Sequence, residues 1–340
     1  MAGLETQARI LLAHGSGGSL SHRLVEELFL PAFRNPALQL MEDSGPFMGG
    51  GHHLVATTDS YVVDPPFFAG GDIGRLAICG TVNDLAVSGA RPLCLTAGFI
   101  LEEGLELELL RRVLESMRAA AAEAGVAIVA GDTKVVPRGK ADRIFINTAG
   151  VGLVETAEPP GAARIQAGDA VLINGPIGDH GMAVMAAREG LALGGDLRSD
   201  CAPLFGLIDA VRAAGITLHA MRDPTRGGLA TTLNELAAAA GVLIEIEEPL
   251  VPVRESVQAA CEILGLDPLY VANEGKVVCF VPGGQAEAAL SAMRRHPHGR
   301  EAARIGQVRS APRPLVKLNT GIGGARILDL LSGEQLPRIC

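Results

Sequence analysis

The sequence predicts a two-domain protein of the α/β (α+β) class that ends in a short flexible tail. Short apolar runs alternate with segments of helical apolar spacing along the chain, which is typical of this class. The 340 residues exceed the usual size of one domain, and a stretch rich in Pro and Ala, 155–163, separates the halves. We expect an N-terminal domain over 1–155, a C-terminal α/β domain over 164–333 and a tail over 334–340.

The composition argues against two classes of function. The formal net charge is −9 and there is no basic run, whereas nucleic-acid binding depends largely on Lys and Arg. No stretch approaches the roughly 18 apolar residues of a membrane span, and the N-terminus lacks the pattern of a signal peptide. We therefore expect a cytoplasmic protein that binds neither nucleic acid nor a membrane.

The first half predicts alternating helices and strands. Ser21 is a suitable helix N-cap, Asp72 begins a second helix, and Gly125 follows a third. The apolar runs between them are rich in β-branched residues and predict strands. The expected helices are 21–33, 72–88 and 105–124, and the expected strands are 54–63, 94–101 and 126–130, the last of them buried.

Three aspartates lie in or beside these apolar elements. Asp59 is in the middle of a strand, Asp84 interrupts a helix, and Asp132 follows the third strand. Each alone fits a cap or a turn, but several carboxylates in one apolar domain need a common counter-charge. A divalent cation that carries nucleotide phosphates supplies one. Asp43 is a weaker fourth candidate, because the glycines after it fit a mobile turn equally well.

Two further features fit nucleotide phosphates. Gly15, Gly17 and Gly18 follow a short apolar run, and such a loop can fold its amides around phosphate oxygens. Lys134 lies two residues after Asp132, where it is either a surface lysine or a cation that faces the γ-phosphate.

The second half repeats the alternation of strands and helices. Glu274 lies in a polar NEGK segment between two apolar runs, so we expect its carboxylate in a cleft, although an ion pair with Lys276 also fits. Arg226 fits a structural tether and a substrate-binding residue equally well. The expected helices are 200–215 and 229–240, a glycine-rich turn at 175–181 leads into another, and the strand-like runs are 169–174, 269–272, 277–281, 305–308, 315–318 and 327–331.

The last residue, Cys340, differs from the other cysteines. The remaining five lie in apolar runs and fit small buried side chains in a reducing compartment. A cysteine at the end of a chain is either a mobile, unhindered nucleophile or simply the final residue.

Motifs along essentially the whole chain resemble those of known enzymes. The segments TTDSYVVDP, GTVNDLAVSGA, AGDTKVV, DPTRGGL and ANEGK resemble the superfamily of aminoimidazole ribonucleotide synthetase, selenophosphate synthetase and thiamin-monophosphate kinase. The terminal PRIC resembles one family within it, the hydrogenase maturation factors HypE, which are carbamoyl dehydratases. The resemblance implies an N-terminal sheet that pairs across a homodimer and binds ATP, and a C-terminal α/β domain that closes over the site.

The same resemblance implies a reaction and its partners. An S-carboxamide on Cys340 would be dehydrated with ATP and Mg²⁺ to a thiocyanate, the source of cyanide ligands for the iron of nickel–iron hydrogenase. The carbamoyl group would come from the carbamoyltransferase HypF, and cyanide would pass to iron held by a HypC–HypD complex.

The resemblance also assigns roles to individual residues. Cys340 would be the substrate arm, Lys134 would stabilise phosphate oxygens, and Glu274 would be the general base. Apart from the resemblance, the position of Arg338 in the tail fits a residue that steers the tail towards the acidic residues or a phosphate, and it also fits a simple spacer. The residues expected to bind ATP are Gly15, Gly17, Gly18, Asn83, Asp132, Thr133 and Lys134, and those expected to bind Mg²⁺ are Asp59, Asp84 and Asp132, with Asp43 as the weaker candidate.

Two alternative functions stay open at this point. Another enzyme of the superfamily would phosphorylate a small molecule or activate an amide, and Cys340 would then be incidental. A nucleotide-binding scaffold would recruit partners through its tail without catalysis.

Overall fold

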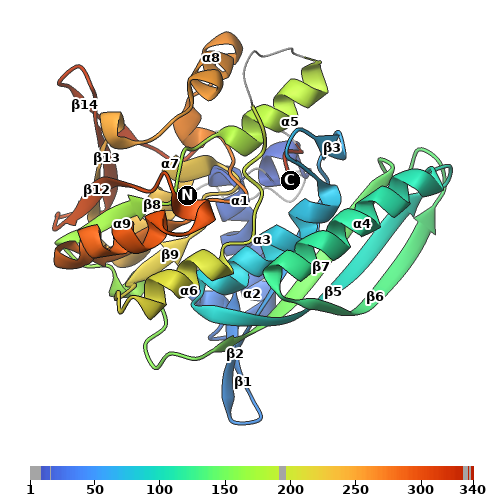
Figure 1. Cartoon of the computed structure of the whole chain (residues 1–340), viewed down its shortest axis with the longest axis horizontal. Coiled ribbons are helices and arrows are strands. Elements are labelled where there is room, and N and C mark those ends of the chain that lie inside the picture. Colours follow the sequence, from blue (N-terminus) through green and yellow to red (C-terminus); the bar gives the residue numbers. More distant parts are fainter. Residues whose placement is uncertain (1–8, 16, 191–196, 332–335, 337) are drawn as a thin grey trace.

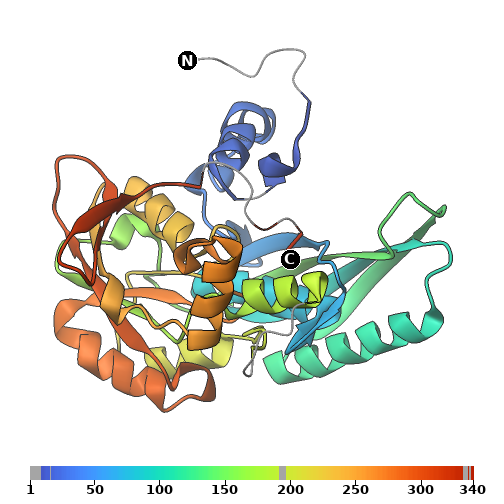
Figure 2. The ribbon, with the colours of Figure 1, turned by 90° about the horizontal axis from the view of Figure 1, so that it is seen from above.

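The computed structural model describes residues 9–15, 17–190, 197–331, 336 and 338–340, and it contains two large β-sheets that lie side by side (Figure 1). The N-terminal half forms one sheet and the C-terminal half forms the other. Viewed from above, the N-terminal helices stand over the junction of the two halves (Figure 2). No helix among the described residues is long and apolar enough to cross a membrane.

The first sheet has five strands in the order β1-β2-β7-β5-β6. Neighbouring strands are antiparallel except β5 and β6, which are parallel and are joined by helix α4 in a β-α-β unit. The strands are β1 Gly45–Gly49, β2 His52–Tyr61, β5 Ala90–Glu102, β6 Ala127–Val136 and β7 Ile144–Val154, and β3 Phe67–Phe68 pairs with β4 Gly71–Asp72 in a separate ribbon.

The sequence correctly indicates the start of α3 and the end of α4, but Ser21 is not an N-cap: helix α1 begins at Ser19, after Gly18, so Ser21 lies inside it. Asp72 caps α3, because its Oδ1 accepts hydrogen bonds from the amides of Gly74 and Arg75 at 2.8 and 3.1 Å. Gly125 ends α4 in the left-handed conformation. The helices are α1 Ser19–Leu24, a π-helical segment Val25–Phe29, α2 Leu30–Phe33, α3 Ile73–Val87 and α4 Leu107–Ala124, with 3-10 turns at Leu12–Gly15 and Leu38–Leu40.

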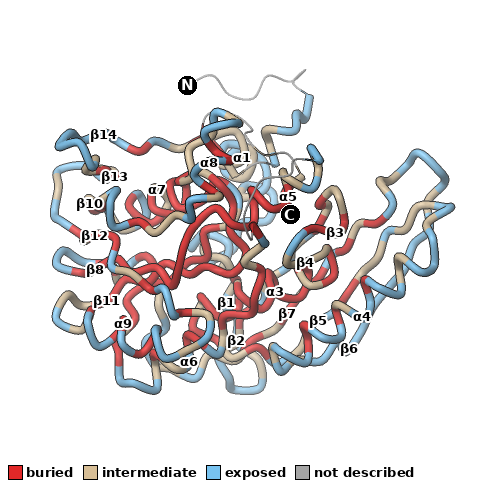
Figure 3. The backbone as a smooth tube through the Cα atoms, turned by 45° about the horizontal axis from the view of Figure 1, so that its top comes forward, coloured by how far each residue is buried: buried red, intermediate tan, exposed pale blue. Residues whose placement is uncertain are grey.

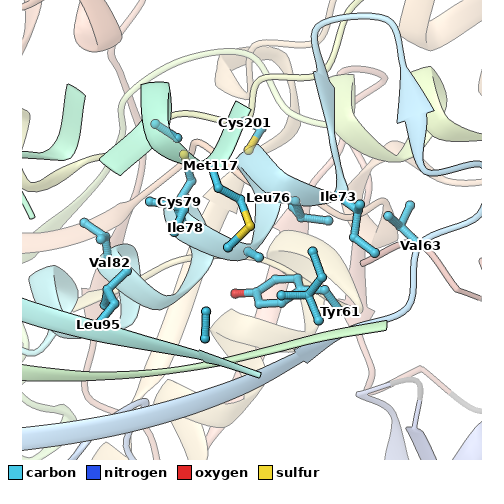
Figure 4. Packing of buried hydrophobic residues seen from close by; sticks show 14 of the residues in the cluster. Tyr61, Val63, Ile73, Leu76, Ile78, Cys79, Val82, Leu95, Met117 and Cys201 are labelled. Atoms are coloured by element: carbon cyan, nitrogen blue, oxygen red, sulfur yellow. The ribbon is translucent and has the colours of Figure 1, made fainter. Parts of the chain in front are cut away.

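Helix α3 is the central element of the molecule. It is apolar and buried on nearly all sides, because the first sheet covers one face while α4, α6 and β9 cover others. Tyr61 of β2, Met117 of α4 and Cys201 of the second half all lie around it (Figure 4). Asn83 and Asp84, which α3 carries, are therefore held on a rigid element.

Strand β6 corrects a prediction from the sequence. The run 126–130 was expected to be a buried strand, yet nearly all of β6 is exposed, including Val129 at 62% and Val135 at 67%. The reason is position, since β6 is the edge strand of the sheet and pairs only with β5. Figure 3 shows the exposed backbone of this region in contrast to the buried centre.

The second sheet has seven strands in the order β14-β13-β10-β12-β8-β11-β9. Its central strands are buried on both faces: Val171 and Phe280 pack on the side of α7, whereas Leu172 and Cys279 pack on the side of α6 and α9. The strands are β8 Asp169–Ile173, β9 Ala220–Arg222, β10 Leu243–Glu247, β11 Val278–Pro282, β12 Ala303–Arg309, β13 Leu315–Asn319 and β14 Ala325–Leu328.

Helices cover both faces of the second sheet, in agreement with the expected α/β architecture. They are α5 Asp179–Glu189, α6 Phe205–Ala213, α7 Gly228–Ala240, α8 Glu255–Leu264 and α9 Ala286–Arg294. The 3-10 turns are Ala162–Arg164, Glu248–Leu250, Pro268–Tyr270, Gly283–Gln285 and Pro297–Gly299.

Two expectations for the second half were wrong. The helix expected to begin at Asp200 begins at Phe205, because the Asp200 carboxylate accepts the amides of Glu274 and Gly275 instead of capping a helix. The expected strand 269–272 forms a 3-10 turn over Pro268–Tyr270, since Pro268 occupies its first position and Asp267 caps it. The first difference arises from a contact between distant segments, whereas the second arises from neighbouring residues.

Candidate functional site

The end of the chain is docked between the two halves. The Val62 amide donates to the Cys340 carbonyl at 3.0 Å, and Arg188 Nη2 donates to the Arg338 carbonyl at 2.8 Å. His180 Nε2 lies 2.9 Å from the Ile339 carbonyl. Because burial lowers the pKa of His180, its ring is neutral and this nitrogen carries the donated proton. Pro337, at the centre of the tail, lies outside the described residues.

Arg338 does not contact the aspartates that were predicted to bind Mg²⁺, which corrects the expectation that it steers the tail towards them. Its guanidinium donates to the Val62 carbonyl at 3.0 Å and pairs with Asp142. Arg338 therefore anchors the tail to the first sheet's rim.

The Cys340 thiol faces a charged interior. Burial raises its pKa to about 12; the positive charge of Arg226 opposes this shift, while the negative charges of Glu274 and Asp59 add to it. A cavity of about 80 Å³, lined by Ser60 and Arg226 among others, lies beside the thiol. One water occupies about 30 Å³ of the liquid, so the cavity has room for a group of a few heavy atoms.

The glycine-rich loop lies against the same pocket. The Gly15 carbonyl accepts a hydrogen bond from Arg226 Nη1 at 2.9 Å. A Cβ on Gly17 would lie 3.1 Å from the Arg226 carbonyl, and one on Gly18 would lie 2.5 Å from the Leu331 carbonyl. Glycine is thus needed at Gly18 for close packing. The assignment of the three glycines to ATP stays a prediction.

An acidic cluster lies next to the tail pocket. Asp43, Asp84 and Asp223 each offer a carboxylate oxygen within 4.8 Å of the other two. Burial raises the pKa of Asp43 and of Asp84 well above the usual value, and neighbouring carboxylates add to the shift. Burial likewise raises the pKa of Asp223 to about 7. Three hard oxygen ligands that repel one another fit a divalent cation such as Mg²⁺.

Arg222 supplies the counter-charge at one side of this cluster. Its guanidinium is buried, and Nε lies 2.9 Å from Asp43 Oδ2. Nη2 and Nη1 pair with Glu42 at 3.0 Å and Glu235 at 3.3 Å. Asp43 is thereby fixed in position, which supports the weaker of the predicted metal ligands.

Asp59 and Glu274 are close enough to both the acidic cluster and the thiol to interact electrostatically with them. The charge of Asp59 raises the pKa of Asp84, Glu274 and Cys340, and its Oδ2 accepts the Tyr61 hydroxyl at 3.2 Å. Glu274 is 3% exposed, and burial raises its pKa well above the usual value, with Arg226 opposing. A buried carboxylate with a raised pKa suits proton abstraction.

The alternative ion pair between Glu274 and Lys276 does not form. Lys276 pairs with Asp200 at 2.9 Å instead, and Asp200 accepts the amides of Glu274 and Gly275 at 3.1 and 3.2 Å. The Glu274 carboxylate is therefore free of Lys276 and interacts with the charges of Arg226 and Asp59 beside the tail pocket.

Asn83 ties α3 to the second half. Its Nδ2 donates to the carbonyls of Ala202 and Glu274 at 3.1 and 3.3 Å, and its Oδ1 accepts the Leu204 amide at 2.8 Å. Because both donor hydrogens are used, the predicted role of Asn83 in ATP binding would require these bonds to be exchanged.

Three predicted residues lie elsewhere in the chain. Asp132, Thr133 and Lys134 are on the exposed edge strand β6, where Lys134 Nζ pairs with Asp132 at 2.9 Å. Through the pairs Asp132–Gly98, Gly98–Asn147 and Asn147–Ser60, Asp132 lies three strands from β2. At about 4.8 Å between strands, that is roughly 14 Å. One chain therefore does not bring these residues to the acidic cluster.

Asp223 and Arg222 belong to this site, although the sequence did not predict either of them as a site residue. Both precede the glycine pair that opens α7, in the segment RDPTRGG. Their proximity to Asp43 and Asp84 depends on how the two halves pack. The only signal in the sequence was the family motif DPTRGGL, which begins at Asp223 and directly follows Arg222.

Two family models match the chain in succession. The model "AIR synthase related protein, N-terminal domain" matches residues 41–154, and "AIR synthase related protein, C-terminal domain" matches residues 166–319. Together they cover well over half of the chain.

Curated relatives match nearly its full length. Carbamoyl dehydratase HypE of Azotobacter vinelandii is 53% identical over 333 residues, which are 97% of this chain and 96% of that protein. The Escherichia coli protein of the same name is 50% identical over 337 residues, 97% of this chain and 99% of that protein.

Solved structures show the same similarity. A HypE–HypF complex matches with a TM-score of 0.86 and 50% identity, covering 91% of this chain and 99% of that one. HypE in complex with ATP matches with a TM-score of 0.83 and 51% identity, covering 98% and 100%. A ThiL enzyme complexed with AMPPCP and TMP, at 20% identity and a TM-score of 0.71, shares the fold.

Proposed function

Because this chain belongs to the HypE family of carbamoyl dehydratases, which act in hydrogenase maturation, we propose that it dehydrates an S-carboxamide on its own Cys340 to a thiocyanate with ATP. The observation that carries the proposal is the docked tail. It brings Cys340 into a pocket beside Arg226, Glu274 and the acidic cluster.

The reaction removes one oxygen and two protons from the carboxamide. An amide oxygen leaves poorly as oxide, so it takes the γ-phosphoryl group of ATP and departs as phosphate, with ADP as the second product. The nitrogen loses both protons, and its electron pairs complete the C≡N bond on sulfur. The net change is loss of water from the S-carboxamide.

The residues around Cys340 divide this work. Glu274 is the base for the amide protons, because its carboxylate is buried beside the thiol and has a raised pKa. Arg226 Nη1 is held by the Gly15 carbonyl, which keeps the guanidinium beside the substrate. Its charge stabilises negative charge that develops on the carboxamide oxygen and the phosphoryl group.

Asp43, Asp84 and Asp223 are the ligands that we assign to Mg²⁺, with Asp59 next to them. The ion, when bound, neutralises the phosphate oxygens of the nucleotide. Asp132 remains a predicted ligand only in an assembly that brings β6 of another chain to the site.

A homodimer would provide that assembly. Edge strand β6 exposes Ile128, Val129 and Val135 together with unpaired backbone groups, which is unusual for a strand that faces water. Pairing of this edge with a second copy would cover the apolar side chains. It would also place Asp132 and Lys134 of one chain towards the site of the other, as their predicted roles require.

The tail must also leave its pocket. The docked thiol stays protonated near neutral pH, whereas attack on a carbamoyl donor requires a thiolate. We therefore assign carbamoylation by HypF to a released tail, in keeping with the solved HypE–HypF complex. Transfer of cyanide to iron on a HypC–HypD complex would likewise use the released tail, and the whole sequence would take place in the cytoplasm.

Intact-mass analysis of the C-terminal peptide tests this function. After incubation with a carbamoyl donor and HypF, Cys340 should gain a carbamoyl group, and Mg·ATP should then remove one water. Glu274→Gln should retain the carbamoyl group and the fold but lose the water-loss step, while Glu287→Gln, on the far helix α9, should behave normally.

Two results would redirect the assignment. ATP hydrolysis that consumes a free metabolite and persists in Cys340→Ala would favour the small-molecule enzyme. A carbamoylated peptide that never loses water with Mg·ATP would exclude the dehydratase reaction.

A further inference from the structure

A second cavity, separate from the tail pocket, opens in the C-terminal half. Its volume is about 670 Å³, within the range of small-molecule sites, and none of its lining residues lines the tail pocket. Its walls come from the β8–α5 turn, the segment before α6, the start of α8, the segment before β11 and the 297–301 turn.

The lining of this cavity is strongly charged. Arg198, Arg254, Lys276 and Arg300 all contribute to it. Arg254 pairs with Asp179 at 3.1 Å and with Glu301 at 2.8 Å, and Lys276 pairs with Asp200. By contrast, the described part of the chain shows no ion pair or hydrogen bond from the guanidinium of Arg198 or of Arg300. Two cations thus face the cavity without a protein anion.

The wall also contains an incomplete hydrogen-bonding group. The Asp179 side chain is only 6% exposed, and its Oδ1 is buried without a partner among the described residues, although Oδ2 is paired. A buried carboxylate oxygen without a donor is unfavourable. A ligand that carries a donor would complete this group.

The cavity shares residues with the supports of the catalytic pocket. Asp200, which pairs with Lys276, holds the amides of Glu274 and Gly275. Ser199 Oγ lies 2.8 Å from His180 Nδ1, and the opposite nitrogen of that ring holds the tail at the Ile339 carbonyl. A ligand that engages Lys276 or Ser199 therefore acts on the positions of Glu274 and of the tail.

We propose that this cavity is a second ligand site, which binds a small phosphate-bearing molecule that also carries an amine or hydroxyl group, and that its occupancy is coupled to the catalytic pocket. Arg198 and Arg300 bind the phosphate, since guanidinium groups match phosphate oxygens in charge and geometry. Asp179 accepts the donor group. The coupling half of the proposal rests on the function proposed for Glu274, whereas the binding half does not.

Calorimetric titration with inorganic phosphate and with O-phosphoethanolamine tests the binding half. Both probes should bind, and the double variant Arg198→Ala/Arg300→Ala should weaken both by about tenfold or more. Asp179→Asn should weaken only O-phosphoethanolamine. The control Arg295→Ala/Arg313→Ala, which removes two exposed cations outside the cavity, should change neither affinity. Thermal melting confirms that each variant is folded.

The possible outcomes test ligand binding and its coupling to the catalytic pocket separately. Absence of binding, or affinities that are equal in the wild type and in Arg198→Ala/Arg300→Ala, overturns the site. If binding is confirmed, saturating O-phosphoethanolamine should change the rate of water loss from the carbamoylated tail at least twofold, and an unchanged rate overturns the coupling. Binding in a protein that shows no dehydration at all would leave the site in place and refute the proposed function.

Discussion

The chemical state of Cys340 depends on where its side chain lies. In the docked tail Cys340 is half-buried near Glu274 and Asp59, burial of its thiol raises the pKa, and Arg226 is the group that favours the charged form. The same position that suits a neutral S-carboxamide therefore makes the free thiol a poor nucleophile. Docking and release of one residue thus separate the two chemical steps that the family's reaction requires.

Alkylation of Cys340 should report this docking as a function of pH. Burial raises the pKa of the docked thiol to about 12 from 9.0. Below pH 9 both forms are protonated and docking is insensitive to this group; as pH rises from about 9 towards about 12, only the released thiol ionises, so the docked form loses stability.

The measurement compares labelling of Cys340 by iodoacetamide with labelling of a free peptide of the same last five residues. The ratio of the two rates should be far below one at pH 8 and should rise above pH 9. Arg188→Ala, which removes a hydrogen bond to the tail, should raise the ratio at every pH. A ratio near one throughout would mean that the tail is not docked in solution.

At the scale of elements, strand β6 and helix α3 show opposite uses of apolar sequence. Helix α3 is buried within one chain, because a sheet and several helices surround it. Strand β6 has an equally apolar sequence but lies at a sheet edge, so its side chains stay exposed in one chain. An exposed apolar edge usually marks an interface or an aggregation site.

Val129→Asp should therefore weaken the proposed homodimer. A charge near the start of β6 costs free energy on association, because it would be removed from water without a partner. Sedimentation velocity should show a monomer, or a dimer whose dissociation constant is at least tenfold higher than that of the wild type. A tenfold change corresponds to about 1.4 kcal/mol of association free energy. The melting temperature of the monomer should hardly change, since Val129 is 62% exposed.

A matched change serves as the control. Ile322→Asp alters a side chain that is 97% exposed in the other half and should leave the assembly intact. A wild-type protein that sediments as a monomer at all concentrations would refute the dimer and leave Asp132 and Lys134 without a site.

At the scale of the whole molecule, the site exists only at the junction of the halves. Asp43 and Asp84 come from the first half, Asp223 and Glu274 come from the second, and Cys340 arrives from the end of the chain. The junction is held by specific polar contacts as well as by apolar packing. Asn83 of α3 is the most central of these contacts. Its side chain donates to the carbonyls of Ala202 and Glu274 and accepts the amide of Leu204, and all three residues belong to the second half.

Asn83→Ala should consequently loosen this junction. The change leaves the buried Leu204 amide without its acceptor, and a buried unsatisfied group costs about 1–3 kcal/mol. Denaturant unfolding should show a stability loss of that size, and ATP-dependent water loss from the tail should slow. Asn234→Ala, which removes hydrogen bonds within the second half alone, should affect stability without a comparable loss of rate.

The sequence by itself determined the α/β class and most helix ends, and its family motifs predicted a role for the last residue. Asp72 and Gly125 act locally, through a cap and a left-handed turn, so their roles follow from neighbouring residues. The family motifs and the final Cys340 likewise indicate an ATP-dependent dehydratase without reference to any tertiary contact.

Only the tertiary structure decided which charges meet. It brought Asp223 to Asp43 and Asp84, gave Lys276 to Asp200 instead of Glu274, and left Asp132 on an exposed edge. These outcomes depend on packing between segments that are far apart in the sequence, which local patterns do not encode. The physical reason is that the energy of a buried charge is set by its neighbours in space, and those neighbours come from both halves of the fold.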